Sequence, residues 1–422
     1  MTPVRTAEIL AVGSELLTPH RIDSNSLYLT AQLNDIGIDV RSKTVVGDDV
    51  RALADQFHQS LGRVDLVVTT GGLGPTSDDV TREGIAEALG LPLVEDEALV
   101  MAIRTRFERR GLTMPEANRR QAAVPAGARI LANPNGTAPG LWINAGDRVV
   151  VLLPGPPREM QPMFEREVRP ALMARTTGRR VWRRVIKIAG RSESHVEEIA
   201  QPIYGPLASS DVPIETTILA SPGVIELHLS ARGEDAAAIG AALDRGVTAL
   251  ASSLAASVVS VDGRSIEETI GQLLLSHHSR VAVAESCTGG LVMGRLTDVA
   301  GSSAWFVGGV VAYANEVKTG TLGVAPALIA THGAVSEPVG AAMAEGVRRV
   351  LGAEFGLAIT GIAGPTGGSP EKPVGTVVIA LAHEKGTVTR TLRLGGDRPM
   401  VRQHSVVAVL ELLRQTLVAP SS

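Results

Sequence analysis

The residues best suited to chemistry lie in a short turn at residues 284–290, which read AESCTGG. The turn follows an apolar run over 281–283, which predicts a buried strand, and it precedes a predicted helix over 291–299. The start of a helix presents backbone N–H groups that favour anionic or polarised oxygen atoms. Ser286 and Thr288 would add hydroxyls there, and Gly289 and Gly290 would let a ligand approach the backbone closely.

Polar residues further along the chain could complete this site. They are a second serine, a tyrosine, a lysine and a threonine followed by glycine: Ser303, Tyr313, Lys318, Thr360 and Gly361. Hydroxyls and a lysine, with no histidine in the turn, suit hydrolysis of an amide by a serine and lysine pair. Lys318 would act as the base if burial lowered its pKa, while Tyr313, Thr360 and backbone N–H groups held the oxyanion.

The identity of the nucleophile stays open at this point. Either Ser286 or Ser303 could attack, and either could instead cap the segment that follows it. Cys287 is a rival nucleophile, although a lone cysteine is more often a small buried residue. Arg398 and Arg402 could bind a phosphate with their planar guanidinium groups, or could simply be surface charge at the start of a helix.

A second candidate site lies at residues 71–79, which read GGLGPTSDD. The glycines Gly71, Gly72 and Gly74 would let N–H groups approach a phosphate, with the hydroxyls of Thr76 and Ser77 beside them. Two adjacent carboxylates, Asp78 and Asp79, repel a phosphate unless a divalent cation lies between them. The loop therefore predicts metal-assisted chemistry on a phosphorylated ligand. The alternative is a tight turn in which one of the aspartates caps a helix over 80–89.

Other loops could join this second site. The candidates are Asp23, as a helix cap or a metal ligand, a hydroxyl-bearing turn with Asn135 and Thr137, and a rigid turn with Pro154 and Gly155. Strand and helix patterns alternate from residue 1 to about 170, which predicts a mainly parallel sheet with helices on both faces. Such sheets bind ligands beyond the carboxyl ends of their strands, where these loops fall.

The middle of the chain begins with a basic stretch over 175–187, which reads as a linker or as a nucleic-acid patch. A small α+β module spans 171–253 and includes this stretch. The module contains no Gly-x-x-Gly loop of the kind that clamps nucleotides in KH domains. Residues 252–263 read as a linker.

The net charge of −4 argues against a general nucleic-acid coat, and no apolar run reaches the length of a membrane span. A single cysteine suits a reducing compartment, so we expect a cytoplasmic protein.

The C-terminal motifs carry a family resemblance. Residues 284–290, 300–306 (AGSSAWF) and 372–376 (KPVGT) resemble the C-terminal domain of the competence/damage-inducible protein CinA. That resemblance implies a compact α/β domain with nicotinamide mononucleotide (NMN) deamidase activity, which needs no cofactor.

The N-terminal loops resemble the molybdopterin-binding-like domain of CinA proteins. The resemblance implies a metal-dependent pyrophosphatase that acts on ADP-ribose, or a pterin-binding domain of the molybdenum-cofactor type. It also implies a KH-like topology for the middle module. We therefore expect an α/β protein with domains over 1–170, 171–253 and 254–420 that forms a homodimer. The expected function is hydrolysis of NMN and ADP-ribose in pyridine-nucleotide salvage. The alternative is an accessory binding protein of competence or DNA damage, with a pterin- or nucleotide-binding N-terminal domain.

Overall fold

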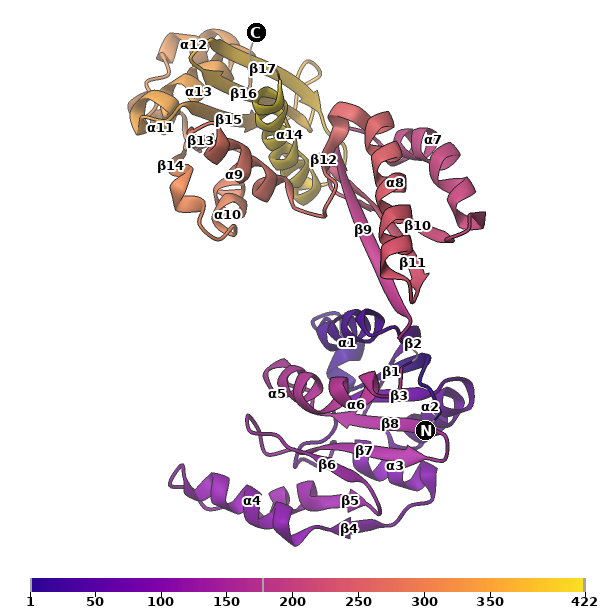
Figure 1. Ribbon diagram of the computed structural model, residues 1–422. Coiled ribbons are helices and arrows are strands. Elements are labelled where there is room, and N and C mark those ends of the chain that lie inside the picture. Colours follow the sequence, from indigo (N-terminus) through magenta and orange to yellow (C-terminus); the bar gives the residue numbers. More distant parts are fainter. Residues whose placement is uncertain (1, 177, 420–422) are drawn as a thin grey trace. The chain divides into compact units, whose positions relative to one another are not determined.

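The structure is a computed structural model that describes residues 2–176 and 178–419 (Figure 1). The chain forms two compact units, the first comprising Met1–Trp182 with Arg232–Ile239 and the second Arg183–Ala231 with Gly240–Ser422. Residues 1 and 420, the outermost positions of the expected first and third domains, lie outside the described residues. The three-part division stays a prediction. No helix in the described part of the chain is both long and apolar enough to cross a membrane.

The first unit is built on a six-stranded sheet with the order β2-β1-β3-β8-β7-β6. The pairs β1–β2, β1–β3 and β3–β8 are parallel, and the last two pairs are antiparallel, which confirms the predicted mainly parallel sheet. The strands are β1 Thr6–Val12, β2 Asp39–Val46, β3 Leu66–Thr70, β6 Arg129–Leu131, β7 Gly140–Ala145 and β8 Arg148–Leu153.

Helices cover both faces of this sheet because its strands are buried on both sides. Along β1, Ile9 belongs to one core and its neighbour Leu10 to the other, as the two-residue period of a strand requires. The first core receives α1 (Ser24–Asp35), α5 (Pro157–Met163), the π-helix η3 (Phe164–Val168) and α6 (Arg169–Met173). The second receives α2 (Val50–Arg63) and α3 (Thr81–Leu89).

A smaller subdomain extends this unit between β3 and β6. The helix α4 (Glu97–Glu108) and the 3-10 segment η2 (Glu116–Ala122) form a small core together. The strands β4 (Leu93–Glu95) and β5 (Ala123–Pro125) make a separate antiparallel pair beside them. Sequence analysis assigned no elements to this segment.

The middle module is a four-stranded sheet with the order β10-β11-β9-β12. Its elements are β9 Arg180–Ala189, α7 Glu193–Tyr204, η4 Gly205–Ser209, β10 Ile214–Ser221, β11 Val224–Gly233, α8 Ala236–Leu254, η5 Ala255–Ser257 and β12 Val258–Ser260. The strand β12 lies inside the stretch expected to be a linker, and it pairs antiparallel with β9. The expected linker therefore supplies the edge strand of the middle sheet.

The C-terminal part contains a five-stranded sheet with the order β14-β13-β15-β16-β17. The first three strands are parallel and the last two pairs antiparallel. The strands are β13 Val281–Glu285, β14 Phe306–Val311, β15 Phe355–Gly361, β16 Thr376–His383 and β17 Gly386–Arg393. The expected α/β class is confirmed here as well.

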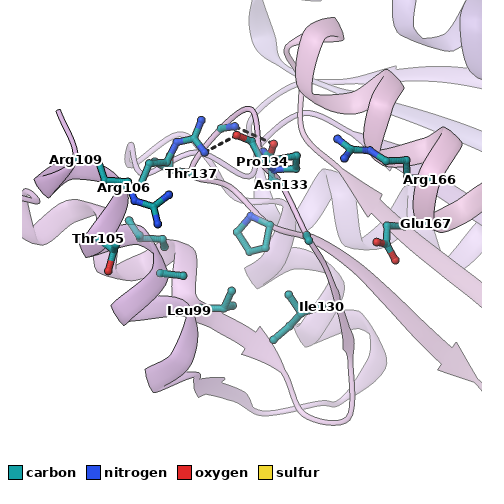
Figure 2. Close-up of a pocket in the computed structure, with 15 residues that line it drawn as sticks. Leu99, Thr105, Arg106, Arg109, Ile130, Asn133, Pro134, Thr137, Arg166 and Glu167 are labelled. Carbon is teal, nitrogen blue, oxygen red and sulfur yellow. Dashed lines mark hydrogen bonds between the residues drawn. The ribbon is translucent and has the colours of Figure 1, made fainter.

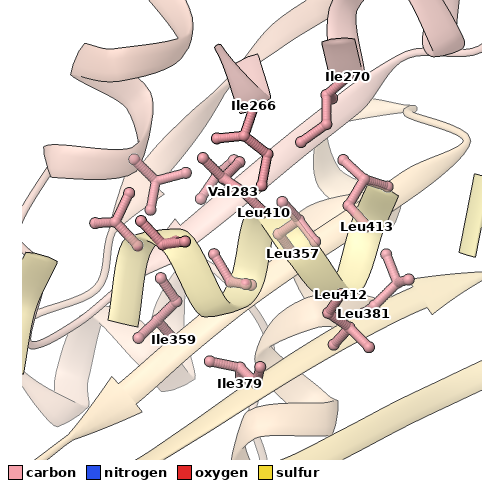
Figure 3. Packing of buried hydrophobic residues seen from close by; sticks show 14 of the residues in the cluster. Ile266, Ile270, Val283, Leu357, Ile359, Ile379, Leu381, Leu410, Leu412 and Leu413 are labelled. Atoms are coloured by element: carbon pink, nitrogen blue, oxygen red, sulfur yellow. The ribbon is translucent and has the colours of Figure 1, made fainter. Parts of the chain in front are cut away.

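Two helical layers enclose this sheet. On one face, α9 (Ile266–Ser276), α10 (Leu291–Thr297) and α14 (Arg398–Val418) pack into a core of branched aliphatic residues. Figure 3 shows Leu410 and Leu413 of α14 among Ile266, Val283 and Leu357. On the other face, α13 (Glu337–Leu351) packs with residues from α11 (Asn315–Gly320) and α12 (Pro326–His332). These layers fix the ends of β13 and β14, where the candidate residues lie.

Candidate functional site

The C-terminal candidate site begins where β13 ends. Ser286 follows the last strand residue, and its N–H donates to the Ile359 carbonyl of the neighbouring strand at 2.9 Å. The chain then turns through Gly289 and Gly290, whose φ angles are 58° and 98°. Only glycine adopts two such angles in succession without strain. The Ser286 side chain is therefore held at the carboxyl edge of a parallel sheet.

A buried carboxylate fixes this turn from within. Glu285 has no exposed surface, and its two oxygens accept the N–H groups of Gly290 and Met293, each at 2.9 Å. These donors belong to the start of α10, where a negative charge is favourable. The Gly290 N–H group is thus bound to Glu285 and is not free to hold a substrate oxygen. This differs from the expectation that backbone N–H groups of the glycine turn would hold the oxyanion. Sequence analysis did not select Glu285, although an acidic residue at the end of an apolar strand was a visible signal.

Lys318 and Ser286 are brought together, as the predicted serine and lysine pair requires. The Lys318 Nζ atom lies 3.3 Å from the Ser286 Oγ atom and donates to the carbonyls of Ala312 and Tyr313 at 2.8 and 3.1 Å. The lysine side chain is fully buried on α11. Burial lowers the pKa of Lys318 below its ordinary value of 10.5, because an ammonium group loses its hydration there.

Ser303 lies at the other end of the strand pair. It precedes β14, and the neighbouring Trp305 carbonyl accepts the N–H of Val281 at the start of β13. Because β13 and β14 run parallel, roughly 15–20 Å of strand separates this position from Ser286. The structure therefore does not bring Ser303 to Lys318. The two serines looked equivalent in sequence because each sits in a turn next to an apolar strand.

Cys287 is not suited to act as the nucleophile. Its side chain is buried, and burial raises the pKa of its thiol to about 11. A thiol with this pKa stays protonated at neutral pH, whereas the reactive form is the thiolate. Gly361 lies beside it, and a Cβ atom there would be 3.1 Å from the Cys287 Sγ atom. The cysteine is thus packed between two strands.

Two arginines of α14 reach the turn from the side. Arg398 donates to the Tyr313 hydroxyl at 3.2 Å and to the Gly364 carbonyl at 2.9 Å, and Arg402 donates to the Thr288 carbonyl at 2.6 Å. In the described part of the chain, the Arg402 Nε atom and the Thr288 Oγ1 atom are buried without a hydrogen-bond partner. Unpaired buried polar atoms are costly, so these two atoms are open to a hydrogen-bonding partner such as a water molecule or a polar ligand.

Thr360 is used differently from the expectation. Its hydroxyl donates to the Ala334 carbonyl at 2.9 Å and so holds the loop over 333–335. A hydroxyl has a single hydrogen to donate, so this bond leaves none for an oxyanion. Tyr313, by contrast, is exposed, and its hydroxyl accepts from Arg398. Of the predicted oxyanion donors, Tyr313 therefore keeps its hydrogen available.

The N-terminal candidate site is a cleft of about 680 Å³ at the carboxyl ends of β1, β3 and β8. It brings together most of the loop residues predicted for this site. Those that line it are Asp23, Gly71, Gly72, Gly74, Asp78, Asp79, Thr137, Pro154 and Gly155. Thr76 and Ser77 lie in the same loop and are exposed, whereas the Asn135 amide donates to the Arg158 carbonyl at 2.9 Å and holds its own turn.

The loop over 71–79 is tied down by its carbonyl groups. Thr81 donates to the Gly71 carbonyl at 2.8 Å, the buried Arg82 to the carbonyls of Leu73 and Gly74 at 2.6 and 3.0 Å, and Arg120 to the Thr76 carbonyl at 2.6 Å. In a trans peptide the next N–H points opposite to the carbonyl. The N–H groups of Gly72, Gly74 and Ser77, which follow the carbonyls of Gly71, Leu73 and Thr76, therefore face away from the side chains that bind those carbonyls.

Sequence analysis missed both arginines. The first turn of a helix disfavours positive charge, because the helix dipole is positive there. An arginine at the second position of α3 was therefore a signal of a specific role. Asn25 was also missed. It donates to Thr70 at 2.9 Å and to the Gly155 carbonyl at 2.7 Å, and its Oδ1 atom is buried without a partner among the described residues.

The expected helix-capping role of Asp78 or Asp79 is wrong. The helix α3 begins at Thr81, its N-cap is Val80, and no side chain makes the capping hydrogen bond. The Asp79 carboxylate instead accepts the Thr76 N–H at 2.9 Å and the Thr76 hydroxyl. Asp78 is exposed. Asp23 does cap a helix, because it accepts the Ser26 N–H at the start of α1.

The predicted metal ligands make no complete metal site by themselves. In residues 2–176 and 178–419, no group of three or more His, Cys, Asp or Glu side chains could hold a metal ion. Asp23 and Asp79 already accept hydrogen bonds, while Asp78 lines the cleft with an exposed carboxylate. Magnesium commonly binds through one or two carboxylates plus substrate phosphates. The residues therefore fit a cation that arrives with a phosphorylated ligand.

Comparison with known proteins gives matches over the whole chain. Residues 263–417 match the family model described as the CinA C-terminal domain, and residues 8–174 match the probable molybdopterin binding domain. A "CinA-like protein" of Koribacter versatilis is 44% identical over 98% of this chain and 100% of its own length. A "putative competence-damage inducible protein" of Desulforudis audaxviator is 43% identical over 97% and 98%.

Solved structures match parts of the chain. The crystal structure of the protein CinA with unknown function from Thermoplasma acidophilum covers 38% of this chain and 95% of its own, with 35% identity and a TM-score of 0.37. A competence/damage-inducible protein from Agrobacterium tumefaciens covers 36% of this chain and 94% of its own, with 40% identity and a TM-score of 0.34.

Proposed function

The chain belongs to the CinA family, and on that premise we propose that its C-terminal domain deamidates NMN to nicotinate mononucleotide and ammonia. The observation that carries this proposal is the 3.3 Å contact between the Lys318 Nζ atom and the Ser286 Oγ atom, made by a fully buried lysine. A serine activated by a lysine of lowered pKa is a known arrangement for attack on a carbonyl carbon.

The surroundings of Lys318 suit its neutral form. A neutral amine has two hydrogens and one lone pair, and two backbone carbonyls, those of Ala312 and Tyr313, lie within reach of the hydrogens. The lone pair then faces the Ser286 hydroxyl, which would donate its proton as its oxygen bonds to the carboxamide carbon. The protonated Lys318 would return this proton to the leaving ammonia. Water would then hydrolyse the acyl-enzyme by the same transfers in reverse.

Substrate binding is assigned to the other polar groups of the turn. We expect the N–H groups of Cys287 and Thr288, directly after the nucleophile, to receive the oxyanion with the Tyr313 hydroxyl. Arg402, with its unpaired Nε atom, and the exposed Arg398 would bind the nucleotide phosphate. The substitution that tests this mechanism is Lys318→Met. We expect the variant to release no ammonia from NMN while its circular dichroism spectrum stays that of the parent protein.

Two controls make this experiment decisive. Lys385→Met changes an exposed lysine at the turn between β16 and β17, and it should keep the parent rate. An Lys318→Met protein that is folded and still turns over NMN at the parent rate would reject the serine and lysine mechanism. A parent protein that releases no ammonia from NMN would reject the substrate.

For the N-terminal domain we propose a second activity, the hydrolysis of ADP-ribose to AMP and ribose 5-phosphate. The supporting observation is the loop over 71–79, whose carbonyls are bound by Thr81, Arg82 and Arg120 so that the N–H groups of Gly72, Gly74 and Ser77 are left for a diphosphate. Asp78 would hold a divalent cation together with that diphosphate. Such a cation, when bound, would neutralise the charge that develops on the leaving phosphate.

This second activity is tested with ADP-ribose and a series of divalent metals. Asp78→Asn should raise the metal concentration needed for half-maximal hydrolysis, because one negative ligand is lost. Asp55→Asn, an exposed change on α2, is the matched control. NMN deamidation should stay unchanged in both variants. If the parent protein hydrolyses no ADP-ribose with any metal, the pterin-binding alternative gains support. A gel shift with single-stranded DNA tests the accessory role, and DNA binding that weakens steeply with salt would favour it.

A further inference from the structure

A second pocket of about 600 Å³ lies beside the N-terminal cleft (Figure 2). Its walls come from α4, from Ile130 of β6, from the loop over 132–139 and from the π-helix η3. Gly136 and Thr137 line this pocket, and Thr137 also lines the neighbouring cleft. The loop over 132–139 is therefore a shared wall. A pocket of this size accommodates a small organic molecule.

The pocket has an apolar floor and a basic rim. Figure 2 shows Leu99 and Ile130 between two charged sides, with Arg106 and Arg109 on one and Arg166 on the other. Arg106 is bound to the Pro134 carbonyl at 2.7 Å through one nitrogen only. No ion pair of these three arginines occurs within residues 2–176 and 178–419. The side of the rim with Arg106 and Arg109 thus carries positive charge without an acidic partner there, whereas Glu167 lies beside Arg166 on the other side.

The spacing of two arginines at the end of α4 fits a phosphate, with Arg106 in the last turn of the helix and Arg109 as its C-cap residue. Positions 106 and 109 are three residues apart, so both side chains leave the same face of the helix. Guanidinium groups bind phosphate through paired N–H donors, which makes two of them on one face a strong anion site. Glu167 lines the opposite side and disfavours a second anionic group there. It would accept a hydrogen bond from an amino group instead.

From these features we propose that this pocket is a second nucleotide site, which binds a nucleoside monophosphate with an amino-bearing base. The phosphate lies at Arg106 and Arg109, the base lies on the aliphatic floor, and its amino group faces Glu167. The site is separate from the cleft at residues 71–79, and its occupancy does not depend on whether that cleft hydrolyses ADP-ribose.

The shared wall gives the two sites a direct connection. The Asn133 amide donates to the Glu159 carboxylate and to the Ala138 carbonyl, both at 2.8 Å, and its oxygen accepts the N–H of Gly136 at 2.9 Å. Glu159 lines the neighbouring cleft. A ligand that moves the Asn133 turn would therefore move a carboxylate of the other site.

The test uses AMP as the probe and the full-length protein in a calorimetric titration at low salt. The double variant Arg106→Gln/Arg109→Gln should weaken AMP binding about tenfold or more, because charge-assisted hydrogen bonds to the phosphate are lost. The matched control is Arg104→Gln/Arg110→Gln, which removes the same charge at exposed positions outside the pocket lining. This control should bind AMP like the parent protein.

A steric variant keeps the proposal falsifiable if charge removal disturbs the loop. Ala102→Phe on α4 places a ring in the pocket and leaves all the arginines in place, and it should also weaken AMP binding. Equal AMP affinity in the parent protein and in Ala102→Phe would overturn the proposal, as would equal losses in the two double variants. Adenosine or inorganic phosphate binding as tightly as AMP would overturn the nucleotide assignment. No AMP binding by the parent protein would do the same.

Discussion

The carboxylate of Glu285 accepts the N–H of Met293 at 2.9 Å across the turn that carries Ser286. The same carboxylate also binds the Gly290 N–H, so one buried side chain closes the loop between β13 and α10. Ser286 is the residue directly after Glu285, and its position beside Lys318 depends on this loop.

Replacing Glu285 with glutamine should therefore lower catalysis more than substrate binding. The amide offers one acceptor oxygen where two were used, so one helix N–H loses its partner, at a cost of about 1–3 kcal/mol in the free energy of unfolding. We expect kcat for NMN to fall while KM changes little. Glu384→Gln, an exposed change at the turn between β16 and β17, is the control. A larger change in KM than in kcat would contradict a positioning role.

The pH dependence of NMN deamidation should follow Lys318. Its pKa is lowered by burial, and the neutral amine is the proton acceptor, so kcat/KM should rise with pH and level off below 10.5. The free energy of unfolding should also rise with pH. The unfolded chain binds more protons than the folded one between the lowered pKa and 10.5, so stability rises with pH across this window.

Lys318→Met should remove this part of the pH dependence of stability. The measurement is the difference in Tm between parent and variant over a pH series that ends near 10.5. We expect the parent protein to gain stability relative to Lys318→Met as the pH rises. A constant difference would show that the lysine has its ordinary pKa in the folded protein.

The two serines should differ sharply in their effect on activity. Ser286→Ala should abolish NMN deamidation, because the hydroxyl near Lys318 is lost. Ser303→Ala should keep the parent rate, since it lies at the opposite end of the β13–β14 pair. Steady-state ammonia release measures both. An inactive but folded Ser303→Ala protein would show that the site extends to that end of the sheet.

Arg82→Met should damage the N-terminal site and its stability together. The variant leaves the Gly74 carbonyl without this donor, at a cost of about 1–3 kcal/mol, while the Leu73 carbonyl keeps only the longer bond from Gln121 at 3.4 Å. We expect a lower Tm for the first unit and lower affinity for ADP-ribose. Arg51→Gln on α2 provides an exposed control. Parent-like Tm and affinity in Arg82→Met would show that the loop keeps its shape without this arginine.

Local patterns predicted the regular elements of the chain well. The expected strand over 281–283 is part of β13 (Val281–Glu285), and the expected helix over 291–299 is α10 (Leu291–Thr297), because the apolar run and the glycines after it mark where the strand ends and the helix begins. The three-residue strand β12 carries no such signal, since its pairing with β9 is a long-range contact. Lys318 was predicted from its chemistry to be the base for either Ser286 or Ser303, and the structure places it beside Ser286.

Site residues that act through the backbone were harder to predict. Glu285, Arg82 and Asn25 bind main-chain groups of loops, and the sequence does not show which carbonyl or N–H a folded loop presents. The same limit explains Thr360, whose hydroxyl was expected to be available and is bound to Ala334. Residue type indicated the chemistry of each site, whereas the partners of each polar group depend on the tertiary structure.

The strand β12 has a consequence for exchanging parts between related chains. Three of its residues, Val258–Ser260, pair with the middle sheet, and α9 of the C-terminal core begins six residues later at Ile266. Consider a hybrid protein whose N-terminal part comes from one related chain and whose C-terminal part comes from another. If the two parts are joined at residues 252–257, within the expected linker, the middle sheet receives its edge strand β12 from a different parent than its other strands. A crossover at residues 261–264 would keep each sheet with its own strands. Hybrid proteins joined at the second position should therefore be recovered in folded form more often than those joined at the first.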